Sequence, residues 1–413
     1  MGALSLAPAE GALTPGPAAL YVHVPFCVSL CPYCDFVVHP GRGARGPTNR
    51  VGVFVQALLR ELELRAPSGP GERYPLRSVY LGGGTPSLLR ADQVAAILAG
   101  VAAGWGIAVD AEITIEANPG PDELGDLEGF LRAGVNRLSL GAQSLDADEL
   151  RRLGRRHSPL DVRRAVSAAR TAGFRDISLD LLYDLPGQTL ASWRETVTEV
   201  IELGTDHVSA YALTLDDPDA EGLTGPLGDH LPVRAGARRW RERARAGQDA
   251  DRAADMYLLA DELLGAAGLA WYELSNWARP GHQSRHNLAY WQQLPYEAVG
   301  PGAHAFDGRV RRWNGARLDA YLAALLPPEG ERPSLPPGGS ESLDSAELAT
   351  ERAVLGLRLR QGISRQTLSA ADPAGSVLPW ARGAGLVTTG PSGAIAFTAR
   401  GRLLSNEVYL RLL

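Results

Sequence analysis

Short apolar runs alternate with longer amphipathic stretches between residues 20 and 215. We expect strands at residues 20–24, 78–81, 112–116, 137–140, 177–182 and 207–213. Between them, apolar residues at helical spacing predict helices over residues 51–65, 91–101, 122–133 and 160–172. Repeated strand–helix units predict an α/β fold, a parallel sheet covered by helices that is either open or closed into a barrel.

Changes of composition divide the rest of the chain. We expect an N-terminal tail over 1–19, the strand–helix unit over 20–215, a Gly-, Asp- and Arg-rich surface excursion over 216–252, an extension over 253–326 and a Pro/Gly/Ser/Glu-rich linker over 327–345. The arginine run at 238–245 is interpreted as a solvated helix face. Residues 346–413 are predicted to form a helix, a hairpin and a closing helix, which is typical of a small winged-helix-like domain. We expect that domain to pack against the rest of the chain and not to bind DNA.

Composition excludes several classes of protein. The chain has 413 residues, 45% hydrophobic and 21% charged, with a net charge of −6, so it carries no overall basic field that would recruit nucleic acid or anionic lipid. After the first 20 residues, the longest uncharged run, residues 94–109, is shorter than the roughly 20 residues of a membrane-spanning helix. The first 20 residues lack the positive region of a secretory signal. We expect a cytoplasmic protein that is not integral to the membrane.

Three cysteines, Cys27, Cys31 and Cys34, lie on one short loop after the first expected strand, and the chain has no others. An odd number clustered in this way does not form a disulfide framework. Three thiolates favour an iron–sulfur cluster that keeps one iron open to a ligand from outside the protein. A zinc site is the alternative, and it would need a fourth ligand such as His23 or His39.

Polar or glycine-rich segments follow each of the six expected strands. The second strand runs into a glycine triplet, and later strands end near Glu116, Gln143 and Asp180. Because the carboxyl ends of parallel strands meet at one edge of a sheet, we expect these groups to share one pocket. The carboxylates suit ribose hydroxyls or an ammonium group, and Arg155 could pair with a carboxylate. Together they predict a pocket for a zwitterionic nucleoside beside the cysteines.

The CxxxCxxC loop, together with GGGTP, EANPG, RLSLGAQS and DLPGQT, resembles the radical S-adenosylmethionine (SAM) proteins. It is similar to the branch that contains oxygen-independent coproporphyrinogen III oxidase and the HemW heme chaperones. The resemblance extends from residue 20 to the C-terminus and implies a partial (β/α)6 TIM-like barrel. It also implies a [4Fe–4S] cluster on the three cysteines and SAM bound beside it, with the number of SAM molecules left open. The SAM pocket would be lined by Tyr21, Tyr33, Gly83, Gly84, Thr85, Glu116, Gln143, Arg155, Asp180 and Ala212.

A second motif separates the two activities of this branch. His286-Asn287-Leu-Ala-Tyr290-Trp291 resembles the HNxxYW signature of the heme chaperones. It implies heme contact through His286, Asn287, Tyr290 and Trp291, with His286 as the iron ligand and His282 or His304 as alternatives. Only about 20 residues precede the first expected strand, and none resembles the N-terminal arm of the oxidase. The resemblance therefore implies a chaperone that transfers heme to respiratory proteins. The alternative is the oxidase reaction of porphyrin biosynthesis.

Overall fold

The computed structural model describes residues 16–44, 46, 49–67 and 74–413. Most of the predicted tail over 1–19 therefore lies outside the described residues. Six neighbouring parallel strands follow one another in chain order: β1 (Ala19–Val24), β4 (Leu76–Gly83), β5 (Ile107–Ala117), β6 (Arg137–Gln143), β7 (Asp176–Tyr183) and β8 (His207–Ala212). The predicted strands and the α/β class are confirmed. β5 begins earlier than expected, directly after the turn that ends the preceding helix.

Further strands extend this sheet on both sides. Beyond β1 lie β11 (Tyr296–Val299), which is parallel to it, and then the antiparallel β12 (His304–Phe306), β13 (Val310–Asn314) and β14 (Gly338–Ser342). Beyond β8 lie the antiparallel β10 (Asn276–Ala278) and β9 (Ala270–Glu273). β14 falls within residues 327–345, where composition predicts a linker. Its sequence, Gly-Gly-Ser-Glu-Ser, lacks the alternation of apolar and polar residues that predicts a strand, because β14 is a largely exposed edge strand.

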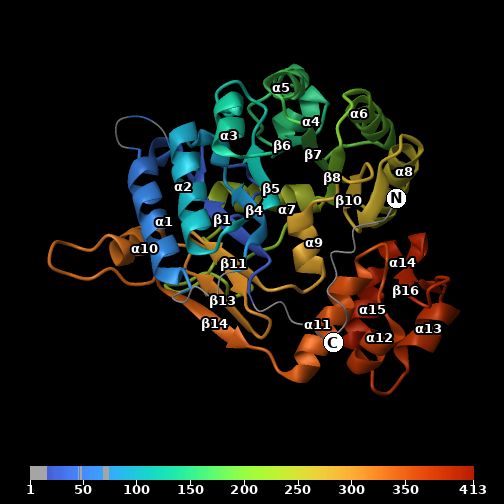
Figure 1. Cartoon of the computed structure of the whole chain (residues 1–413). Helices are drawn as coiled ribbons and strands as arrows, with labels where there is room; N and C mark the ends of the chain where they lie inside the picture. Colours follow the sequence, from blue (N-terminus) through green and yellow to red (C-terminus); the bar gives the residue numbers. More distant parts are fainter. Residues whose placement is uncertain (1–15, 45, 47–48, 68–73) are drawn as a thin grey trace.

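Helices form an arc on the outer side of the parallel strands (Figure 1). They are α1 (Val51–Arg65), α2 (Ala91–Gly104), α3 (Leu127–Ala133), α4 (Ala147–Arg152), α5 (Pro159–Ala172), α6 (Leu190–Glu202) and α8 (Ala250–Ala266), with the 3-10 turns η1 (Gly41–Gly43) and η3 (Pro86–Leu88). In α5, Val162, Val166 and Ala169 lie on one buried face. The Ser158 side chain caps the start of α5, and Gly173, with φ of 113°, ends it in the left-handed conformation.

The predicted helix over 122–133 is shorter than its pattern suggests. Gly125 has φ of 77°, and the side chain of Asp126 accepts a hydrogen bond from the backbone N–H of Gly129. α3 therefore begins only at Leu127. The apolar spacing continues to residue 122, but the Asp126 cap fixes the start of the helix five residues later.

The C-terminal region forms a lobe around its own hydrophobic cluster (Figure 1). It contains α11 (Ser345–Leu357), α12 (Arg365–Ala371), α13 (Val377–Gly383), the hairpin β15 (Val387–Thr389) and β16 (Ile395–Phe397), α14 (Ala399–Leu403) and α15 (Ser405–Leu412). The predicted helix, hairpin and closing helix are present, whereas α12 and α13 before the hairpin were not predicted. The winged-helix-like assignment stays a prediction. The closing helix is broken at Leu404 into α14 and α15.

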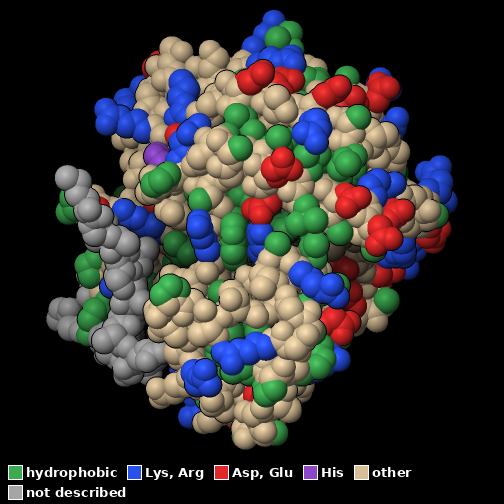
Figure 2. Space-filling view, turned by 90° about the vertical axis from the view of Figure 1, so that its right-hand side faces the viewer, with side chains coloured by type: hydrophobic (Ala, Val, Ile, Leu, Met, Phe, Trp, Pro, Cys, Tyr) green, Lys and Arg blue, Asp and Glu red, His purple; other side chains and the backbone are tan. Residues whose placement is uncertain are grey.

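The surface carries no extended field of one charge on the face shown in Figure 2, where acidic and basic side chains are interspersed. Across the described ranges, no helix combines the length and the apolar character that crossing a membrane requires. The remaining elements are β2 (Phe26–Cys27), β3 (His39–Pro40), α7 (Ala235–Arg245), α9 (Arg285–Trp291) and α10 (Leu318–Leu325).

Candidate functional site

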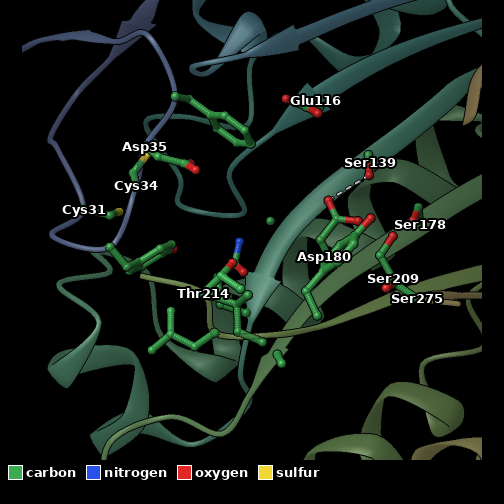
Figure 3. A pocket seen from close by; sticks show the side chains of 18 of the residues that line it. Cys31, Cys34, Asp35, Glu116, Ser139, Ser178, Asp180, Ser209, Thr214 and Ser275 are labelled. Atoms are coloured by element: carbon green, nitrogen blue, oxygen red, sulfur yellow. Dashed lines mark hydrogen bonds between the residues drawn. The ribbon is translucent and has the colours of Figure 1, made fainter. Parts of the chain in front are cut away.

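A cavity of about 1010 Å³ lies along the inner face of the parallel strands. At the carboxyl ends of the strands its wall includes the cysteine loop, together with Gly83 and Gly84 of the glycine triplet at the end of β4. Toward the other end of the strands it includes α9 and residues of the C-terminal lobe. Figure 3 shows the loop with Cys31 and Cys34 facing Asp180 and its neighbouring serines across the cavity. A volume of this size accommodates a nucleoside cofactor with room for a further ligand.

All three cysteines line this cavity, and none is in a disulfide. Two neighbouring side chains donate hydrogen bonds to the sulfurs. Thr85 Oγ1 lies 3.4 Å from Cys27 Sγ, and Arg155 Nη1 lies 3.6 Å from Cys31 Sγ. Such donors stabilise thiolates and help to set the reduction potential of an iron–sulfur cluster. The arrangement fits three sulfur ligands on one loop.

Burial changes the protonation of two of the thiols. Burial raises the pKa of Cys27 to about 11 and raises that of Cys34 further still. Without metal these thiols are therefore protonated at neutral pH, and binding of metal releases the protons. His23 is not available as a fourth zinc ligand, because its ring nitrogens bond to the Tyr21 hydroxyl at 3.1 Å and to the Val37 carbonyl at 2.8 Å. His39 Nε2 has no hydrogen-bond partner, but among the described residues the cysteine sulfurs and the His39 nitrogens do not form a group of three within 4.8 Å of one another, as a single zinc ion requires. The donor set therefore fits a larger cluster with one iron open to the cavity.

One arginine of the predicted surface excursion is buried against the cysteine loop. The guanidinium of Arg241, in α7, donates to the backbone carbonyls of Pro32 at 3.1 Å, Tyr33 at 3.1 Å and Cys34 at 2.9 Å. Its side chain is almost completely covered, unlike the solvated helix face that the arginine run predicts. The periodicity of an arginine-rich run does not reveal which arginine turns inward. Arg241 is thus a loop-holding residue that the sequence analysis missed.

Replacing Arg241 by methionine is expected to loosen the cysteine loop, because three of its carbonyls lose their donor. Residues that orient metal ligands typically change metal affinity by roughly 10- to 100-fold. We expect iron to be lost to a chelator on the order of tenfold faster than from the unmodified protein, as followed by its absorbance under anaerobic conditions. Arg239→Met, at an exposed position of the same helix, is the control. Equal rates for the two variants would contradict this role.

The glycine triplet brings the backbone to the edge of the cavity. A Cβ on Gly83 would lie 2.4 Å from the His23 ring, and one on Gly84 would lie 2.6 Å from the Phe26 carbonyl oxygen. Gly83 also has φ of 104°. Side chains are therefore excluded at both positions, and the main chain itself forms this part of the wall.

Two buried carboxyl groups provide acceptors beside the triplet. Glu116 accepts hydrogen bonds from the Gly83 N–H at 2.9 Å and the Tyr80 hydroxyl at 2.8 Å, and burial raises its pKa to about 7. Asp180 accepts a hydrogen bond from Ser139 at 2.9 Å, and burial raises its pKa as well. These groups suit a ligand that donates hydroxyl or ammonium hydrogens.

Arg155 is fixed between the cysteines and the strand ends. Its Nη2 donates to Asn118 Oδ1 at 2.5 Å and to the Gly141 carbonyl at 2.6 Å.

Of the ten residues predicted for the SAM pocket, nine line the cavity. The exception is Thr85, whose hydroxyl donates to the sulfur of Cys27. Sequence reasoning missed Asn118 and Tyr80. Asn118 was visible in the Glu-Ala-Asn-Pro-Gly motif, whereas Tyr80 lies within a strand and gave no signal.

The HNxxYW motif forms α9, away from the cysteine loop. The backbone N–H groups of Arg285 and His286 donate to the Glu112 carboxylate at 3.0 and 3.1 Å, which fixes the start of the helix. His286, Asn287 and Tyr290 line the cavity. Trp291 is not part of the wall, and its ring stacks against the Arg358 guanidinium at 4.2 Å.

His286 is only 1% exposed, and both of its ring nitrogens have partners. Nδ1 bonds to the Ser78 hydroxyl at 3.0 Å, and Nε2 bonds to the Tyr290 hydroxyl at 2.7 Å. Burial lowers its pKa to about 3, so the ring is neutral. Coordination of iron by His286 would therefore require one of these hydrogen bonds to break.

Comparison with known proteins places this geometry in a family. The radical SAM superfamily model matches residues 21–200. The heme chaperone HemW of Mycobacterium tuberculosis is 37% identical over 401 residues, with 96% of this chain and 95% of the relative covered. HemW of Escherichia coli is 38% identical over 305 residues, with 73% and 74% covered.

A solved structure shows the same architecture. Coproporphyrinogen III oxidase (HemN) from Escherichia coli, a radical SAM enzyme, matches with a TM-score of 0.76 and 23% identity over 97% of this chain and 91% of that one. At this identity the match supports the fold alone. The sequence relatives cover most of both lengths, so this chain belongs to the HemW heme chaperone family of the radical SAM superfamily.

Proposed function

We propose that this protein is a cytoplasmic heme-binding chaperone that carries a [4Fe–4S] cluster and SAM and delivers heme to respiratory acceptor proteins. The observation that carries the proposal is the match to HemW over nearly the whole of both chains. The cysteine loop at the mouth of a large cavity supports it, because the radical SAM family implies both cofactors. The proposed acceptors follow from the family resemblance.

Each part of the site has a role in this proposal. Cys27, Cys31 and Cys34 would hold the cluster, which supplies a one-electron donor and an open iron. Arg155 and the buried carboxylates would orient the zwitterionic cofactor, and the backbone of the glycine triplet would approach it closely. Burial of this wall would exclude water from the sulfonium group of the cofactor.

Titration of the anaerobically purified full-length protein with hemin tests the proposal. We expect a shifted Soret band that saturates at a fixed number of hemes per chain. A matched titration of the same protein unfolded in urea controls for non-specific hydrophobic binding, since only a folded site gives a defined endpoint and ligand spectrum. Absence of any saturable spectral change would refute heme binding.

The predicted heme contacts His286, Asn287, Tyr290 and Trp291 are tested on the same preparation. Three of them line the cavity, which supports a contact role. If His286→Ala binds hemin with unchanged affinity, His286 is not a heme contact, and the proposal of heme binding stands.

Incubation with coproporphyrinogen III, SAM and a reductant tests the alternative oxidase reaction. The readout is formation of protoporphyrinogen, and its absence would exclude that reaction.

A further inference from the structure

Several arginines line the cavity, and two of them come from the C-terminal lobe. They are Arg137, Arg155, Arg156, Arg358 and Arg402. Arg137 and Arg155 donate hydrogen bonds to neighbouring protein atoms, and Arg156 is open to solvent. Arg402, from the lobe, donates to the Tyr257 hydroxyl at 3.0 Å and to Asp261 Oδ2 at 2.5 Å. Arg358, also from the lobe, has much weaker partners.

The guanidinium of Arg358 is only loosely paired. Its Nη2 lies 3.5 Å from Glu273 Oε2, whereas well-formed arginine–carboxylate hydrogen bonds are about 2.7–2.9 Å long. Its Nε is buried and has no hydrogen-bond partner in the part of the chain that the structure describes. Buried polar groups are normally hydrogen-bonded, so an unpartnered one suggests a missing ligand. The Arg358 side chain is 25% exposed and forms part of the cavity wall.

Glu273 is committed mainly to its own turn. Its Oε1 accepts hydrogen bonds from the Ser275 N–H at 3.1 Å and from the Asn276 side chain, whereas Oε2 has no hydrogen-bond partner among the described residues. Burial raises the pKa of Glu273, which weakens its ion pair with Arg358. Glu273 is fully buried and is not part of the cavity wall. The charge of Arg358 is therefore largely available to a ligand in the cavity.

Trp291, the last residue of the HNxxYW motif, holds the arginine in place. The Arg358 guanidinium carbon lies 4.2 Å from the centroid of the Trp291 ring. Arginine stacks well on aromatic faces and keeps its edge donors free in that arrangement. Asn287 lies four residues before Trp291 and so shares a face of α9 with it. Asn287 and Arg358 both line the cavity, so the motif and the lobe arginine meet at its wall.

The main chain around Arg358 is also fixed. The Arg358 N–H donates to the Leu355 carbonyl at 3.2 Å, at the end of α11. The Arg360 N–H donates to the Tyr272 carbonyl at 2.9 Å, and Leu359 forms an antiparallel bridge with Glu273 of β9. A side chain held from both the ring and the backbone loses little conformational entropy when it binds a ligand.

We propose that Arg358 binds a propionate carboxylate of heme, and that Trp291 positions Arg358 without contacting the heme itself. A partly exposed guanidinium with unused donors suits a carboxylate better than any apolar or cationic group. The inference rests on the proposed heme binding. It gives Trp291 a role in that binding although its ring is not part of the cavity wall. The carboxylate of SAM has the same chemistry, but SAM is expected beside the cysteine loop.

Hemin and hemin dimethyl ester, titrated into anaerobic full-length protein in the same detergent solution, test the role of Arg358. The two ligands share the iron and the macrocycle, but the ester carries no carboxylate. We expect the unmodified protein to prefer hemin by roughly tenfold or more, as a hydrogen bond to a charged group allows. Arg358→Gln should lose most of this preference and keep its affinity for the ester. Arg360→Gln, at an exposed position outside the wall, is the control and should keep the preference.

Variants of Trp291 test the positioning role with the same two ligands. Trp291→Leu should lower the preference for hemin over the ester, and it should cause no further loss when it is combined with Arg358→Gln. Trp291→Phe retains a flat ring under the guanidinium and should keep most of the preference. If Trp291→Leu weakens hemin and ester to the same extent, Trp291 does not act through Arg358.

The outcomes separate this inference from the proposed function. If the unmodified protein binds no hemin, both are wrong. If it binds hemin and the ester equally well, or if Arg358→Gln weakens both equally, the assignment of Arg358 is wrong and heme binding stands. If Arg358→Gln weakens SAM binding and leaves the preference for hemin unchanged, the carboxylate belongs to SAM and the propionate assignment is overturned.

Discussion

Replacing Cys27, Cys31 or Cys34 by serine is expected to remove most of the protein-bound iron. Only these three sulfurs are available to hold the cluster, since the chain contains no other cysteine. A serine hydroxyl is a harder ligand that is not ionised at neutral pH, so each variant loses one of three anchors. Iron and sulfide per chain, measured after anaerobic reconstitution, provide the readout.

The same loop offers a control for this experiment. Val28→Ala removes a side chain between two of the cysteines that is not part of the cavity wall. It should retain the iron content of the unmodified protein. Iron retention in a cysteine variant equal to that of Val28→Ala would show that the replaced cysteine is not a ligand.

Replacing Glu61 by alanine is expected to destabilise the fold by about 3–5 kcal/mol, the range found when one partner of a buried ion pair is removed. The Glu61 carboxylate is inaccessible to solvent. It accepts hydrogen bonds from Arg65 Nε at 2.7 Å, Asn314 Nδ2 at 2.8 Å, the Gly300 N–H at 2.9 Å and the Tyr321 hydroxyl at 2.7 Å. It thereby joins α1 to β13, which carries Asn314, and to α10, which carries Tyr321.

Urea denaturation followed by circular dichroism measures this effect. Glu63→Ala is the matched control on the same helix, because Glu63 is exposed and pairs with the exposed Arg60. Exposed pairs of this kind contribute less than about 1 kcal/mol. Similar denaturation midpoints for Glu61→Ala and Glu63→Ala would contradict the structural role of the buried carboxylate.

The sequence predicted the parallel core of the fold well because its signals are local. β-type apolar runs, helical spacing and glycine-rich strand ends each arise within one element, and parallel strands bring their carboxyl ends together. Nine of the ten predicted SAM-pocket residues therefore line one cavity. The order of the strands alone was enough to predict that Glu116 and the cysteine loop line the same cavity.

Long-range contacts of polar residues were not predictable in the same way. Arg241 looks like any other arginine of its run, and its inward position depends on loop carbonyls about 200 residues earlier in the chain. β14 has no apolar alternation because its side chains are mostly exposed. The hydrogen bonds of His286 to Ser78 and Tyr290 could not be inferred from the HNxxYW spacing, although they decide whether its nitrogens are free.

Electron paramagnetic resonance of the chemically reduced, oxygen-free protein, recorded before and after addition of SAM, tests the existence of an open iron most directly. A reduced four-iron cluster held by three sulfurs should give a signal whose g-values change when the methionine end of SAM binds. A signal unaffected by saturating SAM, or a protein that contains zinc and gives no signal, would contradict the account.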